Sequence, residues 1–209
     1  METVNDRRFA GCAKSDTSAK LNIVYKRGDM ITAKQKREAQ VRAAALIRAS
    51  GIPVSREEQD SIEVADFGLS RLEEEGAQIL TWVQTDRMGA KVIALLPGQT
   101  LPEHWHPRVG DDAGKEETIR HVAGDLFVYI EGSDTMTRGR PPEGKEEVYT
   151  CRHEIVPRPG EQITFEPLEK HWFRAGPAGA VAYSFSTVVR DALDGFTDDA
   201  VRRITEVVE

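Results

Sequence analysis

A short stretch of the chain, residues 97–124, carries three of its five histidines and a run of acidic residues. It reads PGQTLPEHWHPRVGDDAGKEETIRHVAG. His104 and His106 are separated by one residue, and alternate residues of a β-strand point to the same face. On a strand the pair would aim two imidazoles into one space, as two ligands of a metal ion. Taken alone, the pair fits a solvated face equally well.

The spacing of nearby glycines favours the metal interpretation. Five residues separate Gly98 from His104, and six residues separate Glu117 from Gly124. Glu116 is the rival carboxylate, but neighbouring residues of a strand point to opposite faces, so we expect only one of the two at the metal. The spacing to Gly124 resembles that of the glutamate ligand in the first motif of the cupin family, and this resemblance selects Glu117.

A second motif lies farther along the chain, where ten residues separate Gly160 from His171. Together the two motifs resemble the signature of the cupin family, in which a small β-barrel holds a metal with two histidines and a glutamate from the first motif and a histidine from the second. Ten residues, PRVGDDAGKE, lie between His106 and Glu117 where three or four are usual, so a longer loop must bulge there. In the second motif the usual proline is displaced to Pro167 and the usual glycine is missing.

The resemblance narrows to the D-lyxose isomerase family, which consists of cupin-type aldose–ketose isomerases. The segments that carry it are PGQTLPEHWHP, GKEETIR, VYIEG and KHWFRAG, and IEVADFGL, TDR, HEI and DGFTD fit the same pattern. It covers residues 30–199 and leaves the first 29 and the last ten residues outside. It implies a cupin barrel (a double-stranded β-helix or jelly roll). It also implies interconversion of D-lyxose with D-xylulose, often also of D-mannose with D-fructose, through a metal-stabilised enediol.

The resemblance also implies the residues of the site. Mn²⁺ is the expected cofactor, and its expected ligands are His104, His106, Glu117 and His171. Such nitrogen and oxygen donors also suit Fe, Co, Ni or Zn. Lys115 is the expected catalytic residue, an acid or base if the charge of the metal and partial burial lower its pKa. Arg120 and Arg174 are candidates for binding the sugar, and a homodimer is expected because cupins often pair through their sheets.

One departure bears on the chemistry. The late-strand glutamate that assists proton transfer in the family aligns with Ser184, and the segment AVAYSFSTVV contains no acid. A hydroxyl relays a proton or holds a water molecule, but it does not replace a carboxylate base. Three explanations stay open: Lys115 acts alone or through water, Glu103 or Glu116 takes the role, or the activity has shifted.

Two other classes of function therefore stay open beside the isomerase. A non-catalytic cupin that binds a sugar or a metal is favoured by the missing acid. Another cupin enzyme, a phosphosugar isomerase or an Fe-dependent dioxygenase, is the second alternative. A phosphosugar needs basic residues near the site, and the sequence offers only Lys115, Arg120 and Arg174.

Composition limits the remaining classes. The chain has 209 residues, of which 39% are hydrophobic and 30% charged, which is typical of a globular domain. The formal net charge of -7 disfavours nucleic acid as a partner. No apolar run approaches the roughly 20 residues of a membrane span, and the N-terminus does not resemble a secretory signal. The only two cysteines, Cys12 and Cys151, argue against a disulfide framework, so we expect a cytoplasmic protein.

The elements that must position these residues follow from the pattern of the chain. Residues 1–29 are interpreted as a flexible tail, 30–199 as the cupin domain and 200–209 as a C-terminal tail. Within the domain we expect an N-terminal helical extension over about residues 30–65 and a barrel over about 78–188. The barrel is predicted from short segments rich in β-branched and aromatic residues, which make the fold mainly β.

Local signals refine this outline. Thr32 with Gln35 and Ser55 with Glu58 form capping boxes, which predict two helices in the extension. The segment 197–209 is a candidate for one last short helix. In the strand DLFVYIEG, residues 127 and 129 share one face and are expected either in the core or as a platform for the sugar.

Overall fold

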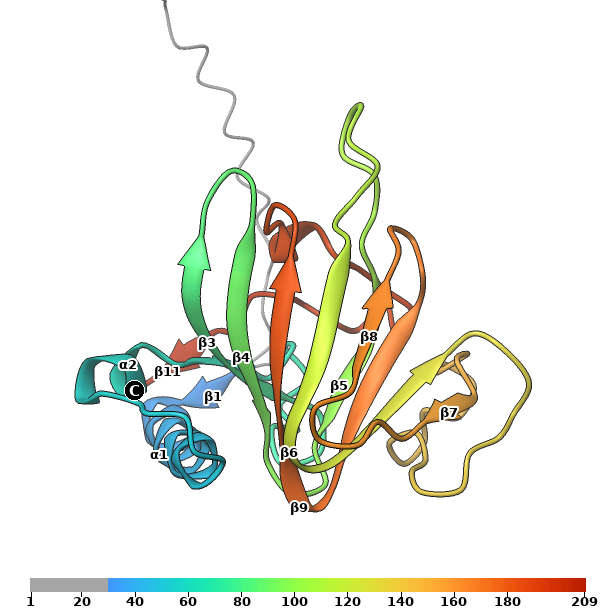
Figure 1. Ribbon diagram of the computed structural model, residues 1–209. Helices are drawn as coiled ribbons and strands as arrows, with labels where there is room; N and C mark the ends of the chain where they lie inside the picture. The colour runs from blue at the N-terminus through green and yellow to red at the C-terminus, as the bar shows by residue number, and fades with distance from the viewer. Residues whose placement is uncertain (1–29) are drawn as a thin grey trace, which may run out of the picture.

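The computed structural model describes residues 30–209, whose strands form a curved, mostly antiparallel sheet with two helices on its outer side (Figure 1). The mainly β prediction with N-terminal helices is thereby confirmed. The segment 1–29, expected as a tail, lies outside the described residues. Among residues 30–209, no helix is both long and apolar enough to cross a membrane.

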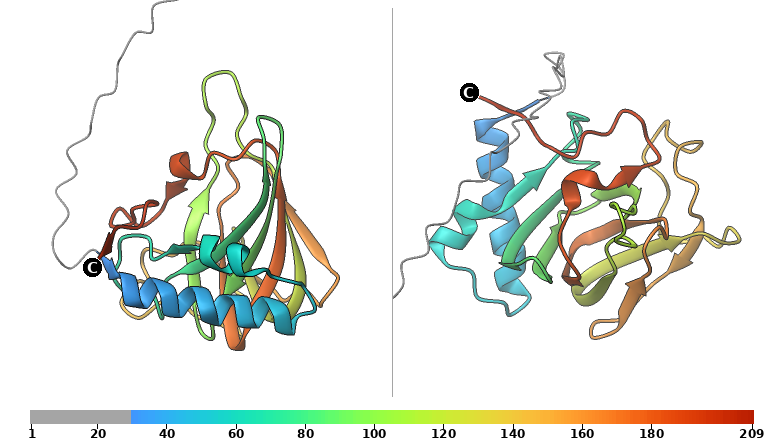
Figure 2. Two further views of the ribbon diagram at one scale, coloured as in Figure 1. Left: turned by 90° about the vertical axis from the view of Figure 1, so that its left-hand side faces the viewer. Right: turned by 90° about the horizontal axis from the view of Figure 1, so that it is seen from above.

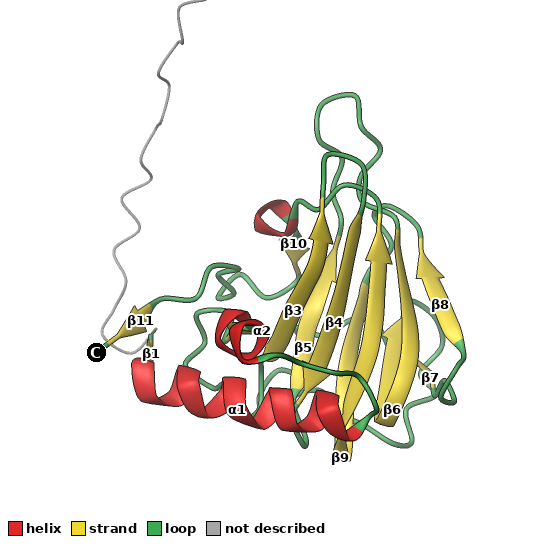
Figure 3. Ribbon diagram, turned by 60° about the vertical axis from the view of Figure 1, so that its left-hand side comes forward, coloured by secondary structure: helices red, strands yellow, loops and turns green. Residues whose placement is uncertain are grey.

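The two helices begin where the capping boxes predicted. Thr32 caps α1 (Ala33–Ala49) and Ser55 caps α2 (Arg56–Ser61), each with the reciprocal hydrogen bonds of a capping box. The buried stripe of α1 packs against the outward-facing apolar side chains of the sheet, including Leu80 and Val181. Figure 2 and Figure 3 show α1 lying across the outside of the strands, so it supports the barrel wall from the side away from the interior.

Within the described residues, nine strands form the main sheet. They are β2 (Glu63–Ala65), β3 (Ala77–Gln84), β4 (Gly89–Leu95), β5 (Thr100–Trp105), β6 (Glu117–Ile130), β7 (His153–Ile155), β8 (Gln162–Phe165), β9 (His171–Ser186) and β10 (Gly195–Phe196). The hydrogen-bonded order is β10-β5-β9-β4-β3-β2, and β6 pairs with β7, β8 and β9. The loop predicted between His106 and Glu117 is present, because β5 ends at Trp105 and β6 begins at Glu117.

The long pair β6 and β9 determines the shape of the barrel. Glu117 pairs with Ser186 at one end of the ladder, and Ile130 pairs with His171 at the other. Two register shifts interrupt the ladder near Gly124, and such bulges bend a strand pair. Gly124 has φ of 85°, and an added Cβ would lie 2.2 Å from the carbonyl oxygen of Gly179, so only glycine fits this bend.

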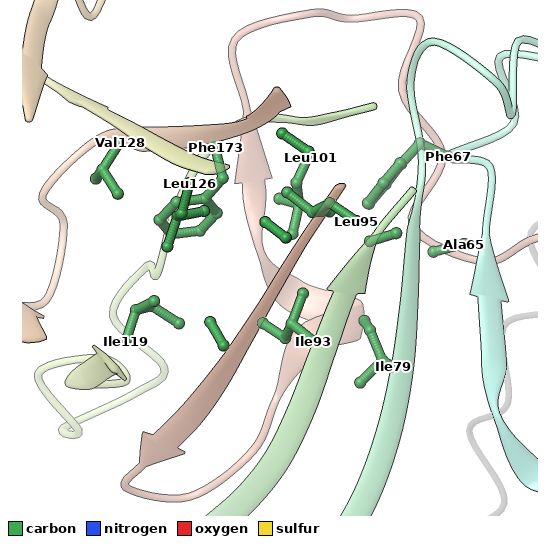
Figure 4. Packing of buried hydrophobic residues seen from close by; sticks show 14 of the residues in the cluster. Ala65, Phe67, Ile79, Ile93, Leu95, Leu101, Ile119, Leu126, Val128 and Phe173 are labelled. Carbon is green, nitrogen blue, oxygen red and sulfur yellow. The ribbon is translucent and has the colours of Figure 1, made fainter. Parts of the chain in front are cut away.

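The interior of the barrel is filled by aliphatic and aromatic side chains that converge from several strands (Figure 4). Leu126 and Val128 of β6 point into this interior and lie near Phe173. Phe127 and Tyr129 therefore face the other way, into a separate cluster in which Tyr129 stacks on Trp172 with ring centroids 3.8 Å apart. This corrects the alternative in which residues 127 and 129 form an inward platform for a sugar.

The C-terminal segment returns to the barrel. A short 3₁₀ helix, η1 (Asp191–Leu193), precedes β10, which pairs with β5. The last short helix expected within 197–209 is absent from the described structure, where the chain instead ends in β11 (Val207–Val208), paired in parallel with β1 (Ile31–Thr32). Residues 200–209, expected as a tail, are held by this pairing and by the burial of Val201 in the interior cluster.

Candidate metal centre

The four predicted ligands lie together at the rim of the barrel. Their ligand atoms are all within 4.8 Å of one another, and all four side chains are buried. The residues concerned are His104, His106, Glu117 and His171. The bend of β6 and β9 explains this meeting, because it brings the start of each strand back to the same rim as the end of β5.

Each imidazole is oriented by a backbone carbonyl oxygen. The Nδ1 atoms of His104 and His171 lie 2.9 Å from the carbonyl oxygens of Pro102 and Glu169. Nδ1 of His106 lies 3.1 Å from the carbonyl oxygen of Lys115. A carbonyl oxygen only accepts, so Nδ1 must carry the hydrogen in each ring and Nε2 is left with its lone pair. This is the usual arrangement around metal-binding histidines.

The free nitrogens are the direct sign that the site fits a metal. Nε2 of His106 and Nε2 of His171 are buried and have no hydrogen-bond partner among the described residues. Nε2 of His106 also lies 3.3 Å from Oε2 of Glu117. Buried polar atoms are rarely left unpaired. A divalent cation would accept the lone pairs of the two nitrogens and balance the negative charge of the carboxylate.

The protonation states suit this role. Burial lowers the pKa of His104 well below its ordinary value, and the neighbouring histidines lower it further. Burial, with a contribution from His106, lowers the pKa of His171 to about 3. Burial acts to raise the pKa of Glu117, but Lys115 and His106 outweigh it and hold that pKa well below the usual range. His104 and His171 are therefore neutral imidazoles and Glu117 is an ionised carboxylate at neutral pH.

Ser184, the residue at the position of the expected acid, is buried against the cluster. Its hydroxyl donates a hydrogen bond of 2.5 Å to Oε1 of Glu117. It faces the interior from β9, in register with Ile119 of β6. The hydroxyl therefore orients the carboxylate from the side opposite to the unpaired nitrogen of His106.

Lys115 also lies at the cluster, as the sequence predicted. Its side chain is buried, and Nζ lies 3.7 Å from Oε2 of Glu117 and 3.1 Å from Oδ1 of Asp191. Burial acts to lower the pKa of Lys115, but Glu117, Asp191 and Asp194 outweigh it and raise the pKa above its ordinary value. In the protein without metal, Lys115 is therefore an ammonium ion.

Two aspartates that the sequence interpretation missed complete the site. Asp191 and Asp194 come from the segment around η1 and line the same cavity as His104 and Lys115. Asp194 opens the DGFTD segment, which matched the family pattern but gave no indication of a role. The cavity is small, about 40 Å³, which is close to the volume of one or two water molecules.

Four other candidates from the sequence lie outside this cavity. Arg120 is exposed and donates to Gln162, because it points away from the barrel interior that Glu117 and Ile119 face. Arg174 donates to Thr100 and lines a different pocket of about 860 Å³. Neither arginine lines the cavity at the metal cluster.

The two alternative acids are also placed outside the cavity. Glu103 is buried, but its carboxylate accepts hydrogen bonds from the hydroxyl of Thr150 and the backbone N–H of Cys151, at 2.6 and 2.7 Å. Glu116 is exposed to solvent immediately before β6. The alternation of strand residues explains both results, because each is a direct neighbour of a residue that faces the cluster.

Comparisons with known proteins agree with this geometry. The family model for D-lyxose isomerase matches residues 55–209. The chain is 48% identical to the D-lyxose ketol-isomerase of Cohnella laeviribosi over 80% of this chain and 93% of that protein. It is 45% identical to the D-lyxose/D-mannose isomerase of Thermosediminibacter oceani over 85% of this chain and 99% of that protein.

Solved structures share the fold at much lower sequence identity. The L-ribose isomerase of Acinetobacter sp. DL28, solved with L-ribose, superposes with a TM-score of 0.69 at 18% identity, covering 86% of this chain and 99% of that one. The L-ribose isomerase of Cellulomonas parahominis gives a TM-score of 0.68 at 20% identity with the same coverage. With the match of the family model and the identity to curated relatives, the chain belongs to the D-lyxose isomerase family.

Proposed function

We propose that this protein is a metal-dependent ketol-isomerase that interconverts D-lyxose with D-xylulose and D-mannose with D-fructose. The observation that carries the proposal is the buried cluster of three histidines and one glutamate, with unpaired Nε2 atoms aimed into it, next to the buried cation of Lys115. Relatives at 45% and 48% identity are named for the same reaction. The ligands of the proposed metal are His104, His106, Glu117 and His171.

Aldose–ketose isomerisation moves a proton between C1 and C2, and negative charge develops on the sugar oxygens during that transfer. A bound divalent metal supplies Lewis-acid stabilisation of that charge, worth several kcal/mol. Manganese fits a set of imidazole and carboxylate donors and is the metal we propose. Lys115 adds a second positive charge beside Glu117, and Ser184 keeps the carboxylate in one orientation.

The segment around η1 and β10 covers the metal cluster, and it affects how a sugar reaches the cluster. The ring of Phe196 lies 5.9 Å from that of His104, between centroids, and β10 is joined to β5 by only two register pairs. A cavity of about 40 Å³ is too small for a monosaccharide. The segment around η1 and β10 therefore shifts outward when the sugar binds, and its closed position excludes bulk water.

The test is a screen of aldoses and ketoses with the full-length protein reconstituted with Mn²⁺, in which the products are identified by chromatography. We expect conversion of D-lyxose and D-mannose, loss of conversion on chelation, and at least a hundredfold loss in His171→Ala. The control is His153→Ala, which removes a histidine outside the cluster. Metal-saturated wild-type protein that converts no sugar of the panel contradicts the proposal.

We also propose a cytoplasmic homodimer. Two exposed aromatic side chains on the outer face of the sheet support pairing between copies, with Trp82 and Phe185 on either side of the half-buried Tyr183 at centroid distances of 5.6 and 5.8 Å. The free, buried thiol of Cys151 is in keeping with a reducing compartment. Sedimentation equilibrium of wild-type and Phe185→Lys protein tests the dimer, because a charge among these aromatic side chains should separate the copies.

A further inference from the structure

The proposed isomerisation requires a group that removes a proton from one carbon and returns it to the next. The late strand offers only Ser184, so the group must come from elsewhere in the cavity. The inference below rests on the proposed function and identifies the residue that carries this proton.

Most carboxylates near the cluster are already engaged by other partners. Glu117 belongs to the metal cluster and accepts from Ser184. Asp191 accepts from Lys115 at 3.1 Å, from Arg203 at 3.3 Å and from Lys91. Three cations around one carboxylate make it a fixed anion that positions Lys115, and they hold the pKa of Asp191 far below its usual range against the opposing effect of burial.

Asp194 differs from these acids in its surroundings. Its side chain is only 8% exposed and lines the same cavity as His104, Lys115 and Glu117. Its nearest cation is Lys115, with Oδ2 and Nζ 3.9 Å apart, which is longer than a hydrogen bond. Within residues 30–209, no hydrogen bond to the Asp194 carboxylate is present, so its oxygens are available to a bound sugar.

We propose that Asp194 is the acid–base residue of the isomerisation. Its carboxylate takes the proton from C2 of the aldose, the C–H electron pair forms the C1–C2 double bond, and the carbonyl pair moves to O1. The proton of the C2 hydroxyl then passes to O1, the C2 carbonyl forms, and Asp194 returns its proton to C1. Lys115 stays an ammonium ion throughout and offsets the charge on the oxygens. Every proton and electron pair is accounted for without an outside oxidant or reductant.

The charges around Asp194 favour this exchange. Burial raises the pKa of Asp194 to about 6, Lys115 and His106 oppose the rise, and Asp191 and Glu117 add to it. Lys91 and Arg203 also line this cavity, but Lys91 pairs with Asp191, and Arg203 pairs with Glu63 and Asp191. General-base catalysis is most effective when the pKa of the base lies near the working pH.

The test compares Asp194→Asn with Asp86→Asn, which changes an exposed aspartate of the β3–β4 turn. Both proteins are loaded with Mn²⁺, and metal content, KM for D-lyxose and kcat are measured. For Asp194→Asn we expect kcat to fall by about 10²- to 10⁴-fold, the usual contribution of an acid–base residue, with metal content unchanged and KM within a few fold. Asp86→Asn should behave as wild type.

A second variant separates proton transfer from a structural role. Asp194→Ala leaves space in the cavity, so added formate should restore kcat at least tenfold in a saturable manner, whereas formamide should not. Retention of kcat within threefold in Asp194→Asn would overturn the assignment while leaving the isomerase function intact. Loss of bound metal in Asp194→Asn would also overturn it, because the residue would then act on the metal cluster. Wild-type protein without activity would instead overturn the proposed function itself.

Discussion

The hydroxyl of Ser184 donates a hydrogen bond to Oε1 of Glu117 across 2.5 Å. Ser184 occupies the position where the family pattern predicts an acid. Its hydrogen bond connects that position to Glu117, the carboxylate of the metal cluster. A serine at this position therefore supports the site rather than marking its loss. It fixes one oxygen of Glu117 while the other remains 3.3 Å from Nε2 of His106.

Ser184→Ala should weaken metal binding. The substitution leaves Oε1 of Glu117 buried without its donor, and removal of such a supporting contact typically lowers metal affinity by about 10- to 100-fold. A calorimetric titration of the apoprotein with Mn²⁺ measures the change in the dissociation constant. Ser133→Ala, in the exposed turn after β6, is the matched control. An unchanged dissociation constant would show that Glu117 is oriented without the hydroxyl.

Ser184→Glu should reduce turnover rather than restore it. The serine is 1% exposed and in contact with Glu117, so a second carboxylate would lie against the first inside a closed space. Two adjacent carboxylates cannot both stay ionised at low cost, and one takes up a proton. We expect metal content and kcat both to fall by at least tenfold. A gain in isomerase activity would instead mean that position 184 is the natural place of the base.

Asp191→Asn should destabilise the protein strongly at neutral pH. The change removes the ion-pair partner of Lys91 and one of the partners of Lys115 and Arg203, and leaving a buried charge without its partner costs about 3–5 kcal/mol. The pKa of Asp191 is lower in the folded protein than its ordinary value of 3.8, so its contribution is present above that value and is lost as the pH falls further.

Urea unfolding of the Asp191→Asn variant and wild type between pH 7 and pH 3 measures this difference, which should shrink toward the acid end. The control is Asp60→Asn, whose exposed pair with Arg56 one helical turn away contributes less than about 1 kcal/mol. Equal stabilities of the Asp191 variant and wild type at pH 7 would contradict the structural role of the three-cation contact.

The sequence was sufficient for the parts of the site that depend on local geometry. Strand alternation paired His104 with His106, and the family resemblance supplied the full ligand set, in which Gly124 permits the bend that returns Glu117 to the rim. Capping boxes placed both helices for the same local reason. These signals lie within a few residues of the positions they determine.

The acids of the C-terminal segment could not be found in that way. Asp191 and Asp194 are 76 and 79 positions after Lys115, and the pairing of β10 with β5 brings them to it. That pairing involves two residues of each strand and leaves no periodic pattern in the sequence. Arg120 and Arg174 lie outside the cavity, because proximity in sequence to a ligand does not decide which face of a strand a residue occupies.

Asp194→Asn should stabilise the metal-free protein at neutral pH. The pKa of Asp194 is raised to about 6 in the folded state from an ordinary 3.8, so the folded protein binds a proton between these values that the unfolded chain releases. Stability therefore falls as the pH rises through this window, and the ionised carboxylate destabilises the fold above pH 6. Asparagine removes that charge, so we expect the variant to exceed wild type by on the order of 1–3 kcal/mol at pH 7.5 and to equal it near pH 3.5. Urea unfolding in the presence of a chelator at the two pH values measures the difference, with Asp86→Asn as a pH-independent reference. A variant less stable than wild type at pH 7.5 would show that the carboxylate is held by a partner after all.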